Sequence, residues 1–109
     1  LLVLLELAKQ DEFNLEDIPN YTSHNVSERF KIKDRGYIRE GYWADLVLVD
    51  LDSQQTVSRE NVSYYCGWSP FEGDTFHSKI VSTFVNGNLV YSEGKILRPC
   101  KGVQLEFNR

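Results

Sequence analysis

The order of apolar and polar positions divides the chain into a helical first third and a strand-rich remainder, with the change at Ile32. Residues 1–10 are dominated by Leu, and only Glu6, Lys9 and Gln10 among them are polar. This composition predicts a helix. Because apolar residues occupy almost the whole circumference of this helix, we expect it to pack against more than one partner. The rest of the chain offers too few such partners.

Two shorter helices are expected before the change of character. Asn14 is a candidate N-cap for the first, and Pro19 and Asn20 are expected to break or restart that helix. Thr22 or Ser23 is a candidate cap for the second, which is expected to run through Phe30. Val26 and Phe30 are four residues apart, so we expect them to share its inward face.

Strand patterns follow. The almost continuous apolar run at residues 44–50 predicts a strand that is buried on both faces. Residues 79–85 alternate in part and predict a second strand. The dipeptide Asn86-Gly87 comes next and favours a two-residue type I′ hairpin turn, with a return strand at residues 88–92.

The remaining segments are shorter or irregular. Residues 58–76 are expected to form a loop with a short helical excursion, because glycines and Pro70 punctuate them. Val103, Leu105 and Phe107 alternate with polar residues, which predicts a final half-buried strand. The pattern as a whole predicts an α+β fold with helices first and strands after, and it contains no internal repeat.

Composition and charge narrow the kinds of partner. The hydrophobic content of 41% and the charged content of 26% are ordinary for globular domains. Sixteen acidic residues outnumber twelve scattered basic ones, so we expect no nucleic-acid partner. The apolar start is much shorter than the ~20 residues that span a bilayer, so no membrane association is expected.

Two features bear on the location and completeness of the protein. Cys66 and Cys100 form no C-x-x-C pair, and we expect two reduced, part-buried thiols in a cytoplasmic protein. The chain contains no methionine and opens on an apolar helix, so we expect a fragment whose N-terminal neighbour is missing. An apolar face exposed in this way favours self-association, which makes a homodimer one expected state.

The residues that most often bind metals are two histidines. His24 and His77 have no histidine partner two or four positions away, and the chain contains neither H-x-H nor H-E-x-x-H. A ligand role for either would need another chain or domain to complete the site. We therefore expect both to be ordinary surface or hydrogen-bonding histidines.

Candidate acid–base and nucleophilic residues are equally dispersed. Asp45 and Asp50 bracket the predicted strand about 17 Å apart, too far for one carboxylate dyad. Asp45 is instead expected to bond the backbone or an Arg near the turn at Gly41. Ser69 precedes Pro70 and lacks the second glycine of a nucleophile elbow. The sequence therefore predicts no catalytic, cofactor-binding or metal-binding residue in this chain.

The string GYIREGYWADLVLVD at residues 36–50 resembles a known signature, G-x-I-x-x-G-x-x-A-D-L-V-L-x-D of the amidohydrolase superfamily. In that superfamily a metal-bearing (β/α)₈ barrel is joined to a small β-sandwich built from both ends of the chain. The resemblance implies that residues 1–31 are the terminal helices of the barrel domain. Residues 32–109 would then form the C-terminal part of the composite sandwich.

Three more segments resemble cyclic amidohydrolases in particular. HNVSERFKI at residues 24–32 is similar to N-P-A-x-x-F-x-I, with Val26 in place of the usual Pro. WSPFEG at residues 68–73 looks like the S-P-F-x-G loop of dihydroorotases, and TFVNGNLVY at residues 83–91 resembles T-x-V-x-G-x-x-V-Y. Dihydroorotase is the first choice of family. Allantoinase and dihydropyrimidinase (hydantoinase) share the last two motifs and are the alternatives.

The resemblance implies an activity for a parent protein, not for this chain alone. Dihydroorotases are zinc hydrolases that interconvert N-carbamoyl-L-aspartate and dihydroorotate in de novo pyrimidine biosynthesis. The family's metal ligands and its substrate-binding Arg and Asn would lie upstream of residue 1. We therefore expect this chain to bind no zinc and to be inactive without the missing barrel. The alternative hypothesis is that the parent protein is a non-catalytic, dihydroorotase-like scaffold.

Overall fold

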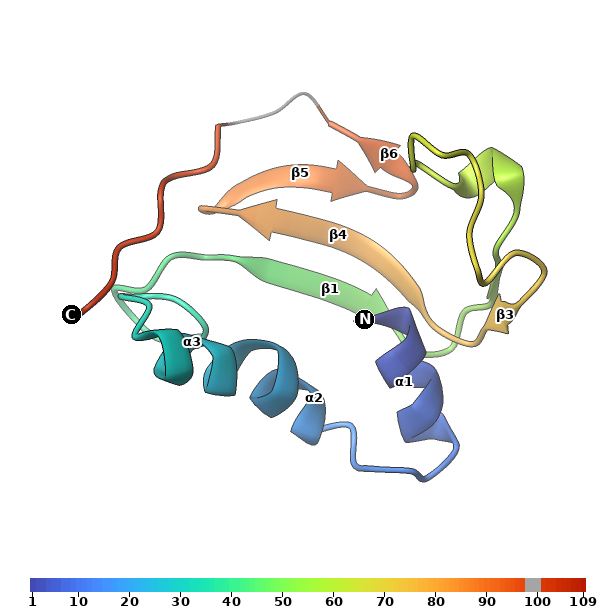
Figure 1. Cartoon of the computed structure of the whole chain (residues 1–109). Coiled ribbons are helices and arrows are strands. Elements are labelled where there is room, and N and C mark those ends of the chain that lie inside the picture. Colours follow the sequence, from blue (N-terminus) through green and yellow to red (C-terminus); the bar gives the residue numbers. More distant parts are fainter. Residues whose placement is uncertain (98–100) are drawn as a thin grey trace.

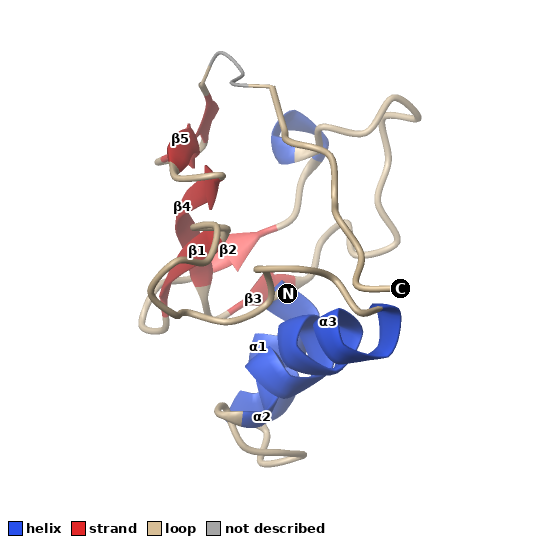
Figure 2. Cartoon of the chain, turned by 90° about the vertical axis from the view of Figure 1, so that its left-hand side faces the viewer, coloured by secondary structure: helices blue, strands red, loops and turns tan. Residues whose placement is uncertain are grey.

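A computed structural model describes residues 1–97 and 101–109 of the chain. An antiparallel sheet forms one layer, and a group of helices lies along its β1 side (Figures 1 and 2). The helical layer contains α1 (Leu2–Lys9), α2 (Asp17–Pro19), a π-helical turn (Asn20–His24) and α3 (Asn25–Phe30). The sheet contains, in spatial order, β1 (Leu46–Asp50), β4 (Lys79–Val85), β5 (Asn88–Ser92) and β6 (Lys95–Ile96). The predicted α+β class and the order of helices before strands are confirmed.

A second, two-stranded sheet pairs β2 (Gln55–Thr56) with β3 (Thr75–Phe76). The segment between these strands contains the 3₁₀ turn Arg59–Asn61, which is the short helical excursion expected within residues 58–76. A capping box stabilises this turn, because Ser58 and Asn61 each accept a hydrogen bond from the other's backbone. The rest of the segment is loop.

Pro19 and Asn20 were expected to break or restart the helix, and α2 does end at Pro19, where a π-helical turn begins at Asn20. Helical structure continues from Asp17 to Phe30 through α2, the π-helical turn and α3. Pro19 is tolerated because it lies in the first turn, where backbone N–H groups have no partner inside the helix. The Thr22 hydroxyl caps nothing and donates to the carbonyl of Ile18 at 2.8 Å, one turn earlier.

The expected inward face of α3 is also wrong. Val26 is 39% exposed and Phe30 is 63% exposed, whereas Ser27 is buried. The helix ends at Lys31, which adopts a left-handed conformation with φ of 53°. The chain then folds back, and the Ile32 N–H donates to the Ser27 carbonyl at 2.9 Å. The inward face is therefore set by this return, which passes over Ser27.

The predicted hairpin is confirmed. β4 and β5 pair in antiparallel register on either side of Asn86 and Gly87. Both turn residues have positive φ, 51° and 81°, as a type I′ turn requires. Glu93 and Gly94 repeat the same pattern, with φ of 48° and 82°, and return the chain into β6.

The predicted burial of the apolar strand is wrong for the described residues. β1 begins at Leu46 and pairs with β4 along one edge. Within it Val47 is 48% exposed and Leu48 is 57% exposed. The helices lie beside β1, and no other described segment covers its remaining surface closely enough to bury these side chains.

The predicted final strand does not form. Residues 101–109 run back past the end of α3, and a single bridge joins Phe107 to Ile32. Backbone bonds from Lys33 N–H to the Glu106 carbonyl and from Asn108 N–H to the Lys31 carbonyl, 2.9 and 2.8 Å long, hold this tail. Because its partner is an irregular segment, the tail does not join the sheet.

The chain buries little apolar surface. Leu5, Ile18 and Phe76 are the buried hydrophobic residues of the described part. The exposed area is 8363 Å², against about 6,200 Å² for a compact monomer of this mass. The radius of gyration is 15.4 Å, against about 13 Å for a compact domain of this length. The fold therefore leaves large apolar faces uncovered.

Candidate functional site

The first half of the signature at residues 36–50 forms a tight contact with α3. Gly36 has φ of 84°, and a Cβ atom added to it would lie 2.5 Å from the Ser27 Cβ. The Ser27 hydroxyl donates to the Arg35 carbonyl at 2.8 Å. The glycine is needed here both for its positive φ and for its missing side chain. Gly41 has a similar φ of 83° but open space around it, so it serves the turn alone.

The second half of the signature ties this contact to the hairpin. One carboxylate oxygen of Asp45 accepts a hydrogen bond from the Arg35 guanidinium, and the other accepts the Asn86 N–H at 2.8 Å. The Gly87 N–H donates to the Ala44 carbonyl at 2.9 Å. Asp45 was expected to bond the backbone or an Arg, and it does both. We call this arrangement of Ser27, Arg35, Gly36, Asp45 and Asn86 the signature joint.

Arg35 is buried within the joint, with its side chain 9% exposed. Its guanidinium carbon lies 5.2 Å from the centre of the Trp43 ring, a cation–π contact. Its second terminal nitrogen has no hydrogen-bond partner among the described residues. A buried arginine depends strongly on its carboxylate partner, because an uncompensated charge is costly away from water. The joint therefore has a structural role.

Asp50, at the other end of β1, belongs to a separate turn. Its carboxylate accepts the Asp52 N–H at 2.9 Å and the Ser53 hydroxyl at 2.5 Å. These bonds, that from Ser53 first, lower the pKa of Asp50 below its ordinary value of 3.8. Asp45 and Asp50 thus hold opposite ends of one strand.

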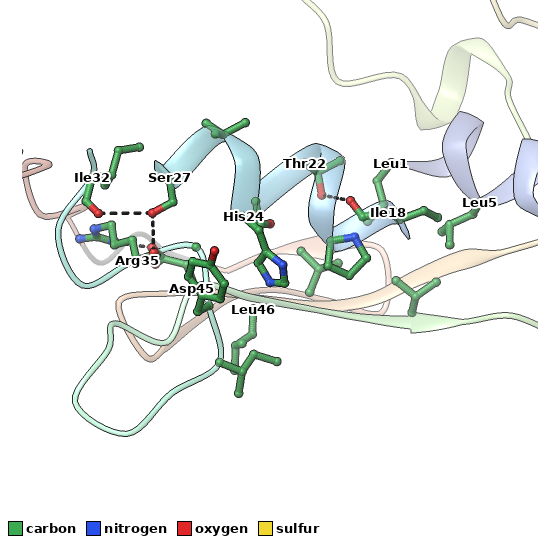
Figure 3. A pocket seen from close by; sticks show the side chains of 18 of the residues that line it. Leu1, Leu5, Ile18, Thr22, His24, Ser27, Ile32, Arg35, Asp45 and Leu46 are labelled. Atoms are coloured by element: carbon green, nitrogen blue, oxygen red, sulfur yellow. Dashed lines mark hydrogen bonds and ion pairs between the residues drawn. The ribbon is translucent and has the colours of Figure 1, made fainter. Parts of the chain in front are cut away.

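A cavity of about 570 Å³ lies between the helices and β1 (Figure 3). The polar groups at its rim are already engaged, since Ser27, Thr22 and the Arg35–Asp45 pair all bond within the chain. A cavity with a mainly apolar lining, whose polar groups mostly bond within the chain, suits packed side chains better than a polar substrate. Its lining includes Leu5, Ile18, Leu46, Val47, Val49 and Leu105.

The two histidines are on different elements. His24 Nδ1 lies 2.9 Å from the Asn20 amide oxygen, which accepts the hydrogen bond, and the ring stacks on Tyr37 with ring centres 4.2 Å apart. The Tyr37 hydroxyl bonds Glu28, and this bond raises the pKa of the phenol. His77 instead contacts Glu6 of α1. Across residues 1–97 and 101–109, no three His, Cys, Asp or Glu side chains are grouped so that they could hold a metal ion.

The loop at residues 67–73 contains no activated nucleophile. Ser69 is buried, and its hydroxyl accepts the Phe71 N–H at 3.2 Å, a local turn contact. Cys66 is exposed, so the expectation of a part-buried thiol is wrong for this residue. The thiol lies 3.5 Å from the Trp68 carbonyl. Cys100 lies outside the described residues.

The sequence of this loop and its flanks is rich in aromatic residues, which suit the cover of an apolar core. Phe71 covers such a core, with its ring centre 5.8 Å from that of buried Phe76. Tyr65 is fully exposed and Trp68 is 56% exposed, so these two side chains do not cover a core in the described chain.

In the described part of the chain, no helix is long and apolar enough to cross a membrane.

Sequence reasoning missed Ser27, Arg35 and the Glu6–His77 contact. The close approach required at Gly36 indicates a small residue opposite it, but nothing in the sequence says which one. Arg35 stands beside Lys31, Lys33 and Arg39 with no pattern to distinguish it. Contacts between residues 71 positions apart have no local signature at all.

Comparison with known proteins gives consistent matches. The sequence model described as the amidohydrolase family matches residues 1–90. An allantoinase from Desulfitobacterium hafniense is 42% identical over 95 residues, which are 86% of this chain and 21% of that protein. A dihydroorotase from Pyrococcus horikoshii is 30% identical over 103 residues, which are 94% of this chain and 24% of that protein.

A solved structure is similar over the same region. The L-hydantoinase (dihydropyrimidinase) from Arthrobacter aurescens superposes with a TM-score of 0.82 at 25% identity, covering 89% of this chain and 22% of that one. The chain thus spans about a fifth to a quarter of the length of the relatives described here.

Proposed function

The chain belongs to the amidohydrolase family, and from this premise we propose that it is the C-terminal portion of a cyclic amidohydrolase. The match over residues 1–90 carries this proposal. The relatives named allantoinase, dihydroorotase and L-hydantoinase support a cyclic amide as the class of substrate. The reaction would be hydrolysis of a ring C–N bond or its reversal.

We assign this portion a structural role in the parent protein. Residues 1–31 would be the last helices of the barrel, and residues 32–109 the C-terminal part of the small β-sandwich. The uncovered apolar faces of α1 and β1 support this division, because both faces need a partner that the described residues do not supply. The signature joint would fix the angle at which the helices meet the hairpin.

The catalytic groups are proposed to lie elsewhere in the parent. His24 and His77 belong to different elements and bond Asn20 and Glu6, so they do not fit a zinc site of three or more converging ligands. We therefore assign zinc to ligands upstream of residue 1 and propose that the present chain is inactive alone. No step of the reaction is assigned to residues of this chain.

Dihydroorotate is the first ring to test. The S-P-F-x-G loop at residues 68–73 and the hairpin motif at residues 83–91 support it. Allantoin is the second, supported by 42% identity to an allantoinase against 30% to the dihydroorotase. The structural likeness to L-hydantoinase supports a hydantoin or dihydropyrimidine as the third.

The experiment compares the zinc-loaded parent protein with this chain alone on all three kinds of ring. Ring opening is followed by loss of the cyclic amide, and a chelator-treated sample of the parent is the control. We expect turnover of one ring by the parent and none by the chain. A folded, zinc-loaded parent that turns over none of them would favour a non-catalytic scaffold instead. Turnover by the chain alone would contradict the structural role.

A further inference from the structure

The turn between β4 and β5 contains Asn86-Gly87, the one Asn-Gly dipeptide of the chain, since the other asparagines are followed by Leu, Tyr, Val or Arg. In an Asn-Gly pair the side-chain amide carbon and the next backbone nitrogen can close a five-membered ring. Glycine permits this most readily, because it has no Cβ atom to obstruct the approach and adopts a wide range of backbone angles. The turn is therefore a chemically vulnerable point of the chain.

The reaction converts the Asn86 amide into an acid without a catalyst. The Gly87 nitrogen loses its proton to water and forms a bond to Cγ of Asn86. The bond from Cγ to Nδ2 then breaks, and this nitrogen leaves as ammonia after taking up a proton. Water opens the resulting cyclic imide at one of its two carbonyl carbons. The product is aspartate or isoaspartate, and in isoaspartate the main chain runs through the side-chain carbons.

The conformation of the turn opposes ring closure. A planar five-membered ring requires Cβ of Asn86 and the Gly87 nitrogen to lie on the same side of the Asn86 Cα–C bond. In a type I′ turn the first central residue has ψ of about 30°, which places these two atoms on nearly opposite sides of that bond. Asn86 has φ of 51° and Gly87 has φ of 81°, as this turn type requires. The Asn86–Gly87 peptide must therefore rotate before the ring can close.

Hydrogen bonds to the turn oppose this rotation. The Gly87 N–H donates to the Ala44 carbonyl at 2.9 Å, and the Asn86 N–H donates to an Asp45 carboxylate oxygen at 2.8 Å, where the turn lies beside the segment that leads into β1 (Figure 1). The Asn88 side-chain amide donates to the Asn86 carbonyl at 3.3 Å. The N–H and the carbonyl of the peptide that has to rotate are thus both hydrogen-bonded.

The side-chain amide of Asn86 is also closed to solvent. Its Oδ1 and Nδ2 atoms are both buried, and neither has a hydrogen-bond partner among residues 1–97 and 101–109. A buried amide without partners is unusual, because it costs free energy. At this position, burial excludes the water that must take up the Gly87 proton and open the imide. It therefore adds to the protection that the turn provides.

We infer that Asn86 is a deamidation site that the signature joint keeps unreactive and that reacts when the joint opens. Aspartate at this position places a second carboxylate beside Asp45, where two like charges repel. Isoaspartate adds an atom to the main chain and disturbs the register of β4 and β5. Either product hinders the joint from closing again, so an opening of the joint leaves a permanent chemical change.

The experiment follows deamidation in the folded parent protein during incubation at mildly alkaline pH. Trypsin releases residues 80–95 as one peptide, because Lys79 and Lys95 provide its cleavage sites. Digestion is short and slightly acidic, and mass spectrometry with fragmentation measures the conversion of amide to acid at Asn86. Asn88, which is followed by Leu, is the internal reference in the same peptide. A sample unfolded in urea gives the rate for the unprotected dipeptide.

Variants separate the joint from overall stability. Asp45→Ala removes the acceptor of the Asn86 N–H and the partner of Arg35. Asp45→Asn keeps the shape of the side chain without its charge, and it tests the same point if the alanine variant does not fold. Leu48→Ala is the matched control, because it shortens an apolar side chain of the neighbouring β1 outside the joint. Circular dichroism establishes that each variant is folded during the incubation.

We expect Asn86 to deamidate at least about tenfold more slowly in the folded parent than in urea. Asp45→Ala should raise the rate in the folded protein about fivefold and Asp45→Asn about threefold, because local opening becomes easier. Leu48→Ala should stay within about twofold of the wild type. Equal rates in the folded and unfolded wild type would overturn the inference, and so would Asp45 variants that react no faster than Leu48→Ala. The inference holds whichever ring the parent protein opens, because the readout is not catalysis.

Discussion

The signature joint and the apolar faces of α1 and β1 differ in how they are completed. In the joint, the Asp45 carboxylate, the Ser27 hydroxyl and the Asn86 N–H all bond within the described chain. On the apolar faces, Leu1 is 44% exposed and Leu48 is 57% exposed. These hydrogen bonds are made within the chain, whereas the apolar faces are left partly exposed.

The difference has a physical reason. Hydrogen bonds and left-handed turns depend on a few neighbouring atoms, so a short segment can complete them. Burial of apolar surface depends on area and needs a second layer of structure. A chain that spans about a fifth of the length of its relatives can therefore complete its hydrogen-bonded contacts and still bury little apolar surface. Variants that act on one region and not on the other test this comparison.

The largest effect is expected for Gly36→Ala in the parent protein. The variant combines a strained positive φ with a Cβ atom 2.5 Å from that of Ser27. We expect a loss of about 2–5 kcal/mol in the free energy of unfolding, measured by chemical denaturation. Gly41→Ala is the matched control, because it has φ of 83° and open space, and should lose only about 1–2 kcal/mol. Equal losses would show that the contact with α3 is absent in the parent.

The second-largest loss in the free energy of unfolding is expected for Asp45→Ala. It leaves the buried Arg35 charge and the Asn86 N–H without their carboxylate. Loss of one partner of a buried pair costs about 3–5 kcal/mol, which the 37% exposure of Asp45 reduces to about 2–4 kcal/mol. Asp52→Ala, at an exposed position, should stay within about 0.5 kcal/mol in the same denaturation assay. A loss for Asp45→Ala as small as that of the control would contradict the role of the joint.

Leu48→Ala tests the uncovered face of β1. If the parent protein covers this face, the variant should lose about 2 kcal/mol in the parent, although Leu48 is 57% exposed in the chain alone. Tyr65→Ala, in the exposed loop, provides the comparison and should change stability by less than about 0.5 kcal/mol. Thermal or chemical unfolding measures both. If Leu48→Ala behaves like the loop variant, β1 is exposed in the parent as well.

The smallest effect is expected at the far end of β1. The Ser53 hydroxyl is the main cause of the lowered pKa of Asp50. Ser53→Ala should therefore raise that pKa towards 3.8, followed by the carboxyl carbon shift of Asp50 in an NMR titration. The stability contributed by this carboxylate is present above pH 3.8 and is lost as the pH falls through the lowered value. An unchanged midpoint would mean that the Asp52 N–H dominates.

Expectations based on turn chemistry were confirmed most fully. Asn86-Gly87 predicted a type I′ hairpin, and the observed φ values and the pairing of β4 with β5 agree with it. The bonding of Asp45 to an Arg and to the backbone was also foreseen, although Arg35 was not singled out. These features depend on residues that are close in sequence or on one strong motif.

Expectations that depend on burial were less successful. Val26, Phe30 and the alternating residues of the C-terminal tail have suitable patterns, yet all remain exposed in the described chain. A hydrophobic pattern identifies which face of an element is apolar, but it does not show which segment packs against that face.

The sequence by itself determined the order of helices and strands, the hairpin at Asn86-Gly87 and the resemblance of residues 36–50 to the amidohydrolase signature. Only the tertiary structure decided that Ser27 lies opposite Gly36, that Arg35 is the partner of Asp45, and that His77 meets Glu6 across 71 positions. Local conformation follows from nearby residues and their φ preferences. Contacts between distant segments follow from how the layers pack, which no short stretch of sequence contains.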